Sequence, residues 1–190
     1  MTHKIITPPE FLPVTLQEAK DHLRVDHADE DALIESLIMA AVDSVEGYTR
    51  RAIVTRLVDV YFDAFSALME MPLSPLKSVE SITYIDADGI TQTLADTEYN
   101  VYTSRTPGAI GPAYGKTWPS VQCQKDAITV RIQAGYGDAW NTVPPAVRAA
   151  ILLMIGHLYE NREAVIVGQA VNTLPLAVDA LLAPYRVYYL

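Results

Sequence analysis

A long and mostly apolar helix is predicted near the carboxyl end of the chain, over residues 143–165 (VPPAVRAAILLMIGHLYENREAV). Pro144 and Pro145 favour a helix start, because proline fixes φ and is tolerated in the first helical turn. Apolar residues recur there at 3.6-residue spacing and also cover a second face. Such a helix is not stable alone in water, so it must be the buried axis of a domain or lie between subunits.

Two further helices are predicted near the amino end. Thr15 and Glu18 fit a capping box, in which each side chain satisfies a backbone amide at the helix start. A longer helix should follow Asp29, since its apolar residues between Leu33 and Val45 form an amphipathic stripe. The short linker between the two helices predicts a helical hairpin. Residues 1–13 contain three prolines and are expected to form an extended arm.

The middle of the chain changes to a period of two, which predicts β-strands. Strands are expected over residues 54–65, 78–86, 90–94, 99–103 and 127–134, with a loop rich in proline and glycine over 106–119. A short helix is expected over 177–182. The predicted fold class is therefore α+β: a helical bundle (an N-terminal helical hairpin plus a long C-terminal helix) with an inserted small antiparallel β-unit. The predicted domains are an arm and hairpin over 1–52, the β-unit over 53–142, and a third segment over 143–190 that packs with 1–52.

Composition limits the classes of function. The 190 residues carry a net charge of −9, and the pI is about 4.8. Sequence-reading nucleic-acid binders usually show a basic patch, so this acidity argues against one. An acidic wall could still enclose DNA and let it slide, whereas the plainer explanation is that acidity aids solubility. A soluble protein made in the cytoplasm is expected, because neither a signal peptide nor an apolar run of bilayer length is visible. Cys123 is the only cysteine, so no intrachain disulfide can form.

No catalytic constellation is recognisable. The four histidines lack metal-ligand spacing, and the chain contains no GxSxG, P-loop or GxGxxG sequence. Asp86 and Asp88 are explained by a tight turn that ends in Gly89. Trp118 and Trp140 are interpreted as packing anchors rather than cofactor stackers. The sequence therefore predicts no catalytic residues, no cofactor, no metal site and no enzymatic activity.

Three segments are candidate interaction surfaces. The tail alternates aromatic and other residues, which predicts either an edge strand of its own β-unit or a strand added to a partner. The end of the long helix is either a solvated charged face or a site of salt bridges between subunits. The turn at Gly89 is the third. The candidate residues are, for the tail, Tyr185, Arg186, Val187, Tyr188, Tyr189 and Leu190; for the helix end, Tyr159, Glu160, Arg162 and Glu163; and for the turn, Asp86, Asp88 and Gly89.

Several motifs, in this order along the chain, resemble head–tail connector (adaptor) proteins of tailed phages, prophages and gene transfer agents. They are LPVTLQEAKDHLRV at 12–25, the helix over 31–48 with TRRA at 49–52, AGYG at 134–137, the VPP helix that ends in YENRE at 159–163, and LAPYR at 182–186. Each motif alone encodes no chemistry, but their common order is specific.

The resemblance implies a structural, non-enzymatic virion protein. Such proteins form a ring, usually of twelve copies, under the portal protein, where they extend the DNA channel and dock tail-side neck or stopper proteins. DNA then passes through without specific binding, no membrane is involved, and the protein lies in the neck of a particle after synthesis in the bacterial cytoplasm. In these terms the tail would dock the portal, the helix end would contact neighbouring subunits, and the turn would face the tail. The alternative is a small-ligand or carbohydrate-binding module with a helical cap and a concave site near Trp118 and Trp140.

Overall fold

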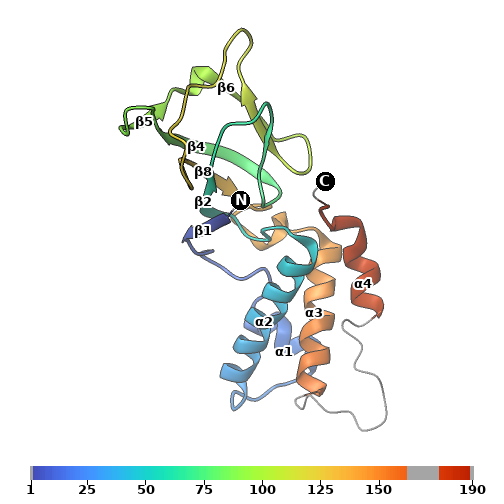
Figure 1. Cartoon of the computed structure of the whole chain (residues 1–190). Helices are drawn as coiled ribbons and strands as arrows, with labels where there is room; N and C mark the ends of the chain where they lie inside the picture. The colour runs from blue at the N-terminus through green and yellow to red at the C-terminus, as the bar shows by residue number, and fades with distance from the viewer. Residues whose placement is uncertain (1, 162–175, 189–190) are drawn as a thin grey trace, which may run out of the picture. The chain divides into compact units, whose positions relative to one another are not determined.

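The computed structural model describes residues 2–161 and 176–188, which fall into two compact units (Figure 1). The first, here called the β-unit, contains residues 2–9, Arg50–Tyr136 and the segment that begins at Val187. The second, the helical unit, is built from Glu10–Thr49 and Gly137–Arg186. The described chain is therefore α+β, and each unit is considered by itself below.

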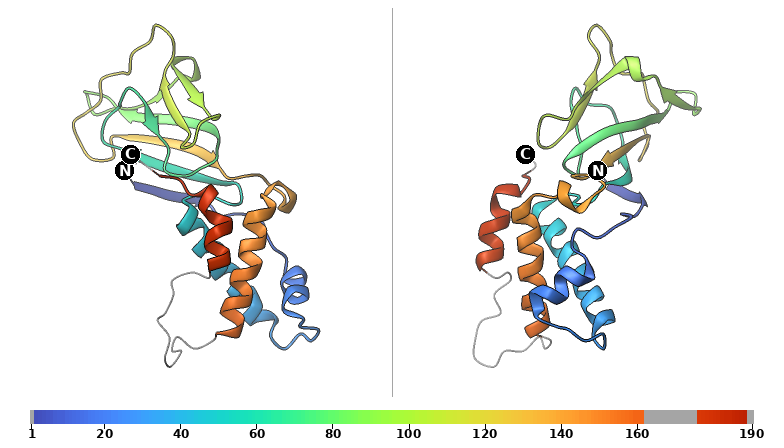
Figure 2. Two further views of the ribbon diagram at one scale, coloured as in Figure 1. Left: turned by 90° about the vertical axis from the view of Figure 1, so that its right-hand side faces the viewer. Right: turned by 180° about the vertical axis from the view of Figure 1, so that it is seen from behind.

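The β-unit contains two antiparallel sheets, seen from two further directions in Figure 2. The five-stranded sheet has the order β1-β2-β8-β4-β5, and the three-stranded sheet has the order β3-β7-β6. A 3₁₀ turn, η1 (Asp96–Glu98), precedes β6. The strands are β1 (Thr2–Thr7), β2 (Arg56–Phe62), β3 (Met69–Glu70), β4 (Leu76–Ile85), β5 (Thr91–Leu94), β6 (Tyr99–Tyr102), β7 (Ala109–Pro112) and β8 (Ile128–Ala134).

The core of the β-unit follows from the two-residue period. In β8 every second residue is buried, from Ile128 to Ala134, so one face of this central strand is apolar. Side chains from both sheets join it in one cluster. The fully or almost fully buried members include Val58, Val60, Met69, Met71, Leu76, Ile82, Ile110, Ile128, Val130 and Ile132.

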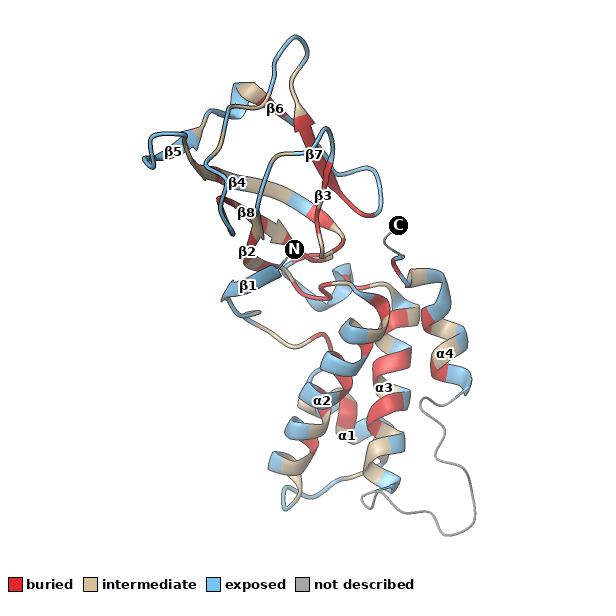
Figure 3. Ribbon diagram, in the orientation of Figure 1, coloured by how far each residue is buried: buried red, intermediate tan, exposed pale blue. Residues whose placement is uncertain are grey.

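The helical unit contains α1 (Leu16–Leu23), α2 (Asp31–Thr49), α3 (Pro145–Glu160) and α4 (Leu176–Leu182). Two 3₁₀ turns, η2 (Trp140–Thr142) and η3 (Ala183–Tyr185), belong to the same unit. α3 contacts the other three helices, and α2 also contacts α1 and α4. The buried residues form stripes along α2 and α3, which Figure 3 shows in red; they include Ile34, Ile38, Val45, Val147, Ile151 and Ile155, with Val178 and Leu182 from α4.

The start of α1 forms the predicted capping box. The Thr15 hydroxyl accepts a hydrogen bond from the Glu18 amide at 3.2 Å, and the Glu18 carboxylate accepts one from the Thr15 amide at 2.9 Å. Lys20 then pairs with Asp31 at 2.6 Å, which links α1 to the first residue of α2. Local sequence signals therefore fix where this first helix begins.

Several observed elements differ from the sequence prediction. β1 lies where an extended arm was expected, and β7 lies inside the loop predicted over 106–119. The predicted divisions of the chain stood after residues 52 and 142, whereas the compact units divide after Thr49 and Tyr136, and residues 2–9 group with the β-unit. The helix predicted over 143–165 ends at Glu160 within the described residues. Of the helices in the described part of the chain, none is long and apolar enough to cross a bilayer.

Candidate assembly surfaces

The described part of the C-terminal tail, residues 185–188, is not an edge strand of its own β-unit, so that alternative is wrong for these residues, while addition of a strand to a partner stays a prediction. Leu182 is fully buried, and the chain continues from α4 directly into the 3₁₀ turn η3, where Pro184 fits an early helical position. The Arg186 amide donates to the Ala183 carbonyl at 3.3 Å and closes this turn. Tertiary packing of α4 thus overrides the β-prone alternation of the tail. Tyr189 and Leu190 lie outside the described residues.

The tail residues differ in their surroundings. The Arg186 guanidinium stands 5.0 Å from the centre of the Tyr48 ring on α2. The Tyr48 hydroxyl donates a hydrogen bond to Asp179 on α4, and this bond, with burial, raises the pKa of Tyr48. Val187 is buried, whereas Tyr188 is 68% exposed. Tyr188 is therefore the described aromatic residue of the tail with most of its surface accessible.

The candidate residues at the end of α3 are only partly described. The Tyr159 hydroxyl donates a hydrogen bond to the Glu30 carboxylate, just before α2. Glu160 is exposed as the last residue of α3. Asn161 then ends the helix, because its side-chain amide donates to the His157 carbonyl at 2.8 Å. Arg162 and Glu163 lie outside the described residues, so Tyr159 and Glu160 alone can be placed, and Tyr159 already serves an intrachain contact.

The turn between β4 and β5 is organised by one carboxylate. Asp86 accepts hydrogen bonds from the amides of Asp88 and Ile90 at 3.0 and 2.9 Å, and from the Gln92 side chain at 2.9 Å. These hydrogen bonds hold the pKa of Asp86 below its ordinary value, and the bond from Gln92 has the largest effect. Gly89 has φ of +82°, a region that favours glycine. The turn explains all three candidate residues structurally, and Asp88 and Gly89 remain exposed at its tip.

The two tryptophans belong to different units. Trp118, in the β-unit, stacks on Phe65 with ring centres 4.5 Å apart and donates from Nε1 to the Ser66 carbonyl at 2.7 Å. Trp140, in the helical unit, has the Arg148 guanidinium 4.6 Å from its ring centre. One face of each ring is thus occupied by a neighbour from the same unit. Both rings thus make packing contacts within their own units, as the interpretation as packing anchors expects, and the carbohydrate-binding alternative gains no support.

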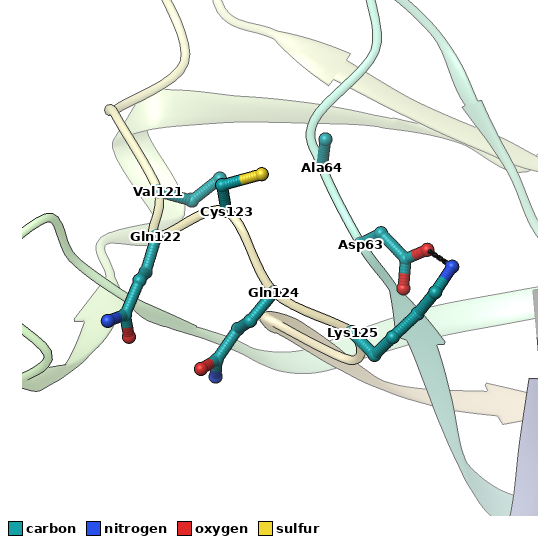
Figure 4. Close-up of a pocket in the computed structure, with 7 residues that line it drawn as sticks. All are labelled: Asp63, Ala64, Val121, Gln122, Cys123, Gln124 and Lys125. Carbon is teal, nitrogen blue, oxygen red and sulfur yellow. Dashed lines mark hydrogen bonds and ion pairs between the residues drawn. The ribbon is translucent and has the colours of Figure 1, made fainter.

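One cavity of about 470 Å³ opens on the β-unit between the end of β2 and the segment before β8 (Figure 4). Its lining includes the side chains of Asp63, Gln122, Gln124 and Lys125. Lys125 lies 2.5 Å from Asp63, and this pairing lowers the pKa of Asp63 and raises that of Lys125. The Cys123 side chain also lines it, but neither a histidine nor a second carboxylate does. The lining residues therefore present no acid–base pair and no activated nucleophile.

Metal chemistry gains no support from the described residues either. Among residues 2–161 and 176–188, no group of three or more His, Cys, Asp or Glu side chains could hold a metal ion.

Comparison with known proteins identifies the family. Residues 13–107, half of the chain, match the model of the family described as "Phage gp6-like head-tail connector protein". The chain belongs to this family. It is therefore a structural connector protein, and the resemblance noted in the sequence is confirmed.

Solved structures with the same fold cover the whole chain. At 22% identity and a TM-score of 0.83, the chain matches 97% of a protein from the neck of an empty gene transfer agent (GTA) particle computed with C6 symmetry. Two more likenesses, each over the full chain and 97% of the other protein, come from the virion of a native GTA particle (23% identity, TM-score 0.83) and the neck of a native GTA particle computed with C12 symmetry (21%, 0.79). A search of curated proteins found no match. At these identities the likeness establishes the fold.

The sequence had no signal for the contacts that shape these surfaces. The Tyr159–Glu30 and Tyr48–Asp179 bonds join residues about 130 positions apart. Each involves a tyrosine at the edge of an amphipathic stripe, where a half-buried ring and a polar tip are expected, but the pattern does not indicate the partner.

Proposed function

We propose that this connector protein forms a ring in the neck of a phage or gene transfer agent particle, between the portal protein and the tail-side neck or stopper proteins. The observation that carries the proposal is family membership combined with a fold shared, over its full length, with proteins from GTA necks. Twelve copies satisfy both symmetries under which those necks were computed, since a twelvefold ring also has sixfold symmetry. The ring would be non-enzymatic, would contact no membrane, and would be made in the bacterial cytoplasm before assembly.

The distribution of charge supports a division of labour between the two units. Counted along the sequence, the helical unit has 14 acidic and 5 basic residues, so it carries a net charge of −9. The β-unit has nine of each and is neutral. Glu35 and Asp43 are exposed on α2. A negative wall repels phosphates, so we assign the DNA channel to the helical unit rather than to the neutral β-unit.

The candidate surfaces keep the roles that the sequence indicated. In this proposal the tail from Tyr185 to Leu190 docks onto the portal, and the end of α3 contacts the neighbouring copy. The exposed turn at Asp88 and Gly89 faces the tail, because loops on a rigid scaffold commonly carry recognition. Removing residues 185–190 should abolish portal binding in a pull-down. Val187 is buried, so Tyr188→Ala is the variant that tests the surface without disturbing the fold.

The decisive experiment is cryo-electron microscopy of particles from the native source. A ring of this chain between portal and tail supports the proposal, with the helical unit expected around the channel. A neck that lacks the chain would overturn it. A ring with the β-unit around the channel would retain the connector role but reject the assignment of the acidic unit to DNA.

A further inference from the structure

β1 is held in the five-stranded sheet by different interactions from those that hold the other strands. All six of its residues are exposed, so the β1 ribbon is pale blue in Figure 3. They include Ile5 at 45% and Ile6 at 39%. The strand pairs with β2 through the backbone and contributes no side chain to the core cluster. An edge strand with no buried side chain detaches at the lowest cost within a sheet. β1 is therefore the most separable element of the β-unit.

The pairing is nevertheless specific in register. Thr2 lies opposite Tyr61, and Lys4 lies opposite Asp59, which in turn lies opposite Arg131 on β8. Opposite charges thus alternate across three neighbouring strands. Cross-strand pairs of this kind stabilise one register over a slipped one. Near the other end the register shifts between Ile5 and Thr7, a bulge that interrupts the ladder close to the linker.

The linker after β1 leads from one unit to the other. Thr7 belongs to the β-unit, and the chain enters the helical unit at Glu10. Pro13 is buried there, and its carbonyl accepts a hydrogen bond from Arg148 at 3.2 Å. Between Thr7 and Pro13 lie five residues, including the exposed Pro8 and half-buried Pro9. Six extended steps reach at most about 20 Å, so β1 can pair with any β2 within that distance.

From these observations we infer that β1 is exchanged between copies in the assembled ring: the β1 strand of one copy pairs with β2 of its neighbour, in the register seen here. The inference rests on the proposed ring. Exchange of an identical element forms the same hydrogen bonds as the intrachain pairing and adds none that must be newly created. In a closed ring each copy donates one β1 and receives one, so no β2 is left as an unpaired edge.

The surface of β1 supports a second copy as the partner. Ile5 and Ile6 expose apolar side chains that an isolated chain leaves in water. Around a ring the neighbouring copy lies beside the exchanged strand and can cover them. Lys4 can lie opposite Asp59 of either copy, so exchange keeps the same order of charges across the strands and favours the same register.

The test uses two complementary cysteine variants in one particle preparation. All variants carry Cys123→Ser as their background, because Cys123 is the only cysteine of the sequence and is exposed. Copies with Thr2→Cys and size-tagged copies with Tyr61→Cys are produced together, and purified particles are oxidised and analysed on a non-reducing gel. Exchange predicts a disulfide-linked pair of one tagged and one untagged chain, which reduction removes. A chain with both substitutions should then give a ladder of linked copies.

A result confined to single chains would overturn the inference. If the mixed particles give no linked pair while the doubly substituted chain closes an intrachain disulfide, β1 stays on its own sheet. The matched control uses Thr91→Cys in place of Tyr61→Cys. Thr91 is exposed on β5 at the opposite edge of the sheet, so it should not form a disulfide with Thr2→Cys whether or not β1 is exchanged. Should Tyr61→Cys prevent folding, Thr7→Cys with Leu57→Cys tests the same register at its other end.

The same particles separate the two proposals. Microscopy of the unoxidised preparation shows whether a ring is present. A ring without linked pairs rejects strand exchange and leaves the proposed function in place, whereas particles in which the chain forms no ring reject the proposed function itself.

Discussion

Gly135 stands where β8 ends, and its replacement by alanine should be the most damaging small substitution in the β-unit. Its φ is +140°, outside the range that residues with a side chain readily adopt. A Cβ atom at this position would lie 2.5 Å from both the Cα and the amide nitrogen of Thr55. Those are backbone atoms, so no side-chain rotation can relieve the contact. One of the two chain segments must move by nearly 1 Å to restore an ordinary contact distance near 3.4 Å.

The cost can be worked from what that movement breaks. The Gly135 amide donates to the Pro75 carbonyl at 2.9 Å, and the next amide donates to the Ile53 carbonyl at 3.2 Å. Each lost hydrogen bond is worth about 1 kcal/mol. A side chain in this backbone region costs about 1–2 kcal/mol more. We therefore expect Gly135→Ala to reduce the free energy of unfolding by about 3–4 kcal/mol, which falls in the severe class of single substitutions.

Gly115→Ala is the matched control. Gly115 also has positive φ, +74°, but a Cβ there would meet nothing within 4 Å. It should cost only the conformational part, about 1 kcal/mol. Urea unfolding followed by circular dichroism gives both values, and hydrogen exchange of β2 and β8 shows whether the loss is local. Equal destabilisation by the two substitutions would refute the argument from the Thr55 contact.

Three further outcomes follow from single contacts. Tyr48→Phe removes the hydrogen bond to Asp179 on α4, so hydrogen exchange over Leu176–Leu182 should become faster while the exchange of α2 stays unchanged. Glu18 has a pKa below its ordinary 4.5, first because of a backbone hydrogen bond at the α1 N-cap. The stability that Glu18 adds is fully present above pH 4.5 and is lost as the pH falls through the lowered pKa. The urea midpoint of Glu18→Gln should therefore fall less with decreasing pH over this acidic range than the midpoint of the unaltered protein. Arg131→Met leaves the buried Asp59 carboxylate without its two bonds at 2.7 and 2.8 Å, and should lower the urea midpoint of the β-unit; an unchanged midpoint would contradict that role.

The sequence predicted the elements whose pattern is local. Thr15 and Glu18 mark the start of α1 by themselves, and the observed β2, β4, β5, β6 and β8 begin and end within a few residues of the predicted strands. β1 was missed because both of its faces are exposed, so THKIIT shows no alternation of apolar and polar residues. Its strand character depends on the β2 edge, more than 50 residues away. β7 was hidden for a related reason, since Gly111 and Pro112 read as loop residues until a neighbouring strand pairs with them.

The candidate surfaces were less accessible to sequence reasoning than the fold. The turn at Asp86 was interpreted correctly because its chemistry lies within a few residues. The intrachain edge strand expected for the tail as one alternative is absent, because the alternation carries no information on what precedes it in space, and here the buried Leu182 continues the helical path. Contacts such as Tyr159 with Glu30 require the tertiary fold. An interaction surface adds a further requirement, the shape of the partner, which no pattern in one chain contains.

The net charge of the whole chain conceals how unevenly charge is divided between the two units. A net charge of −9 spread evenly would indicate little beyond solubility, but the division into two units places all of it on one. Screening limits the reach of exposed charges to about 8–10 Å at physiological salt, so a duplex responds to the nearest surface and not to the average. A neutral β-unit can approach other proteins without long-range repulsion, while the helical unit resists close contact with phosphate. If the helical unit does line the channel, neutralising Glu35 and Asp43 should slow DNA passage through the neck and leave ring formation intact, whereas equivalent changes on the β-unit should affect attachment instead.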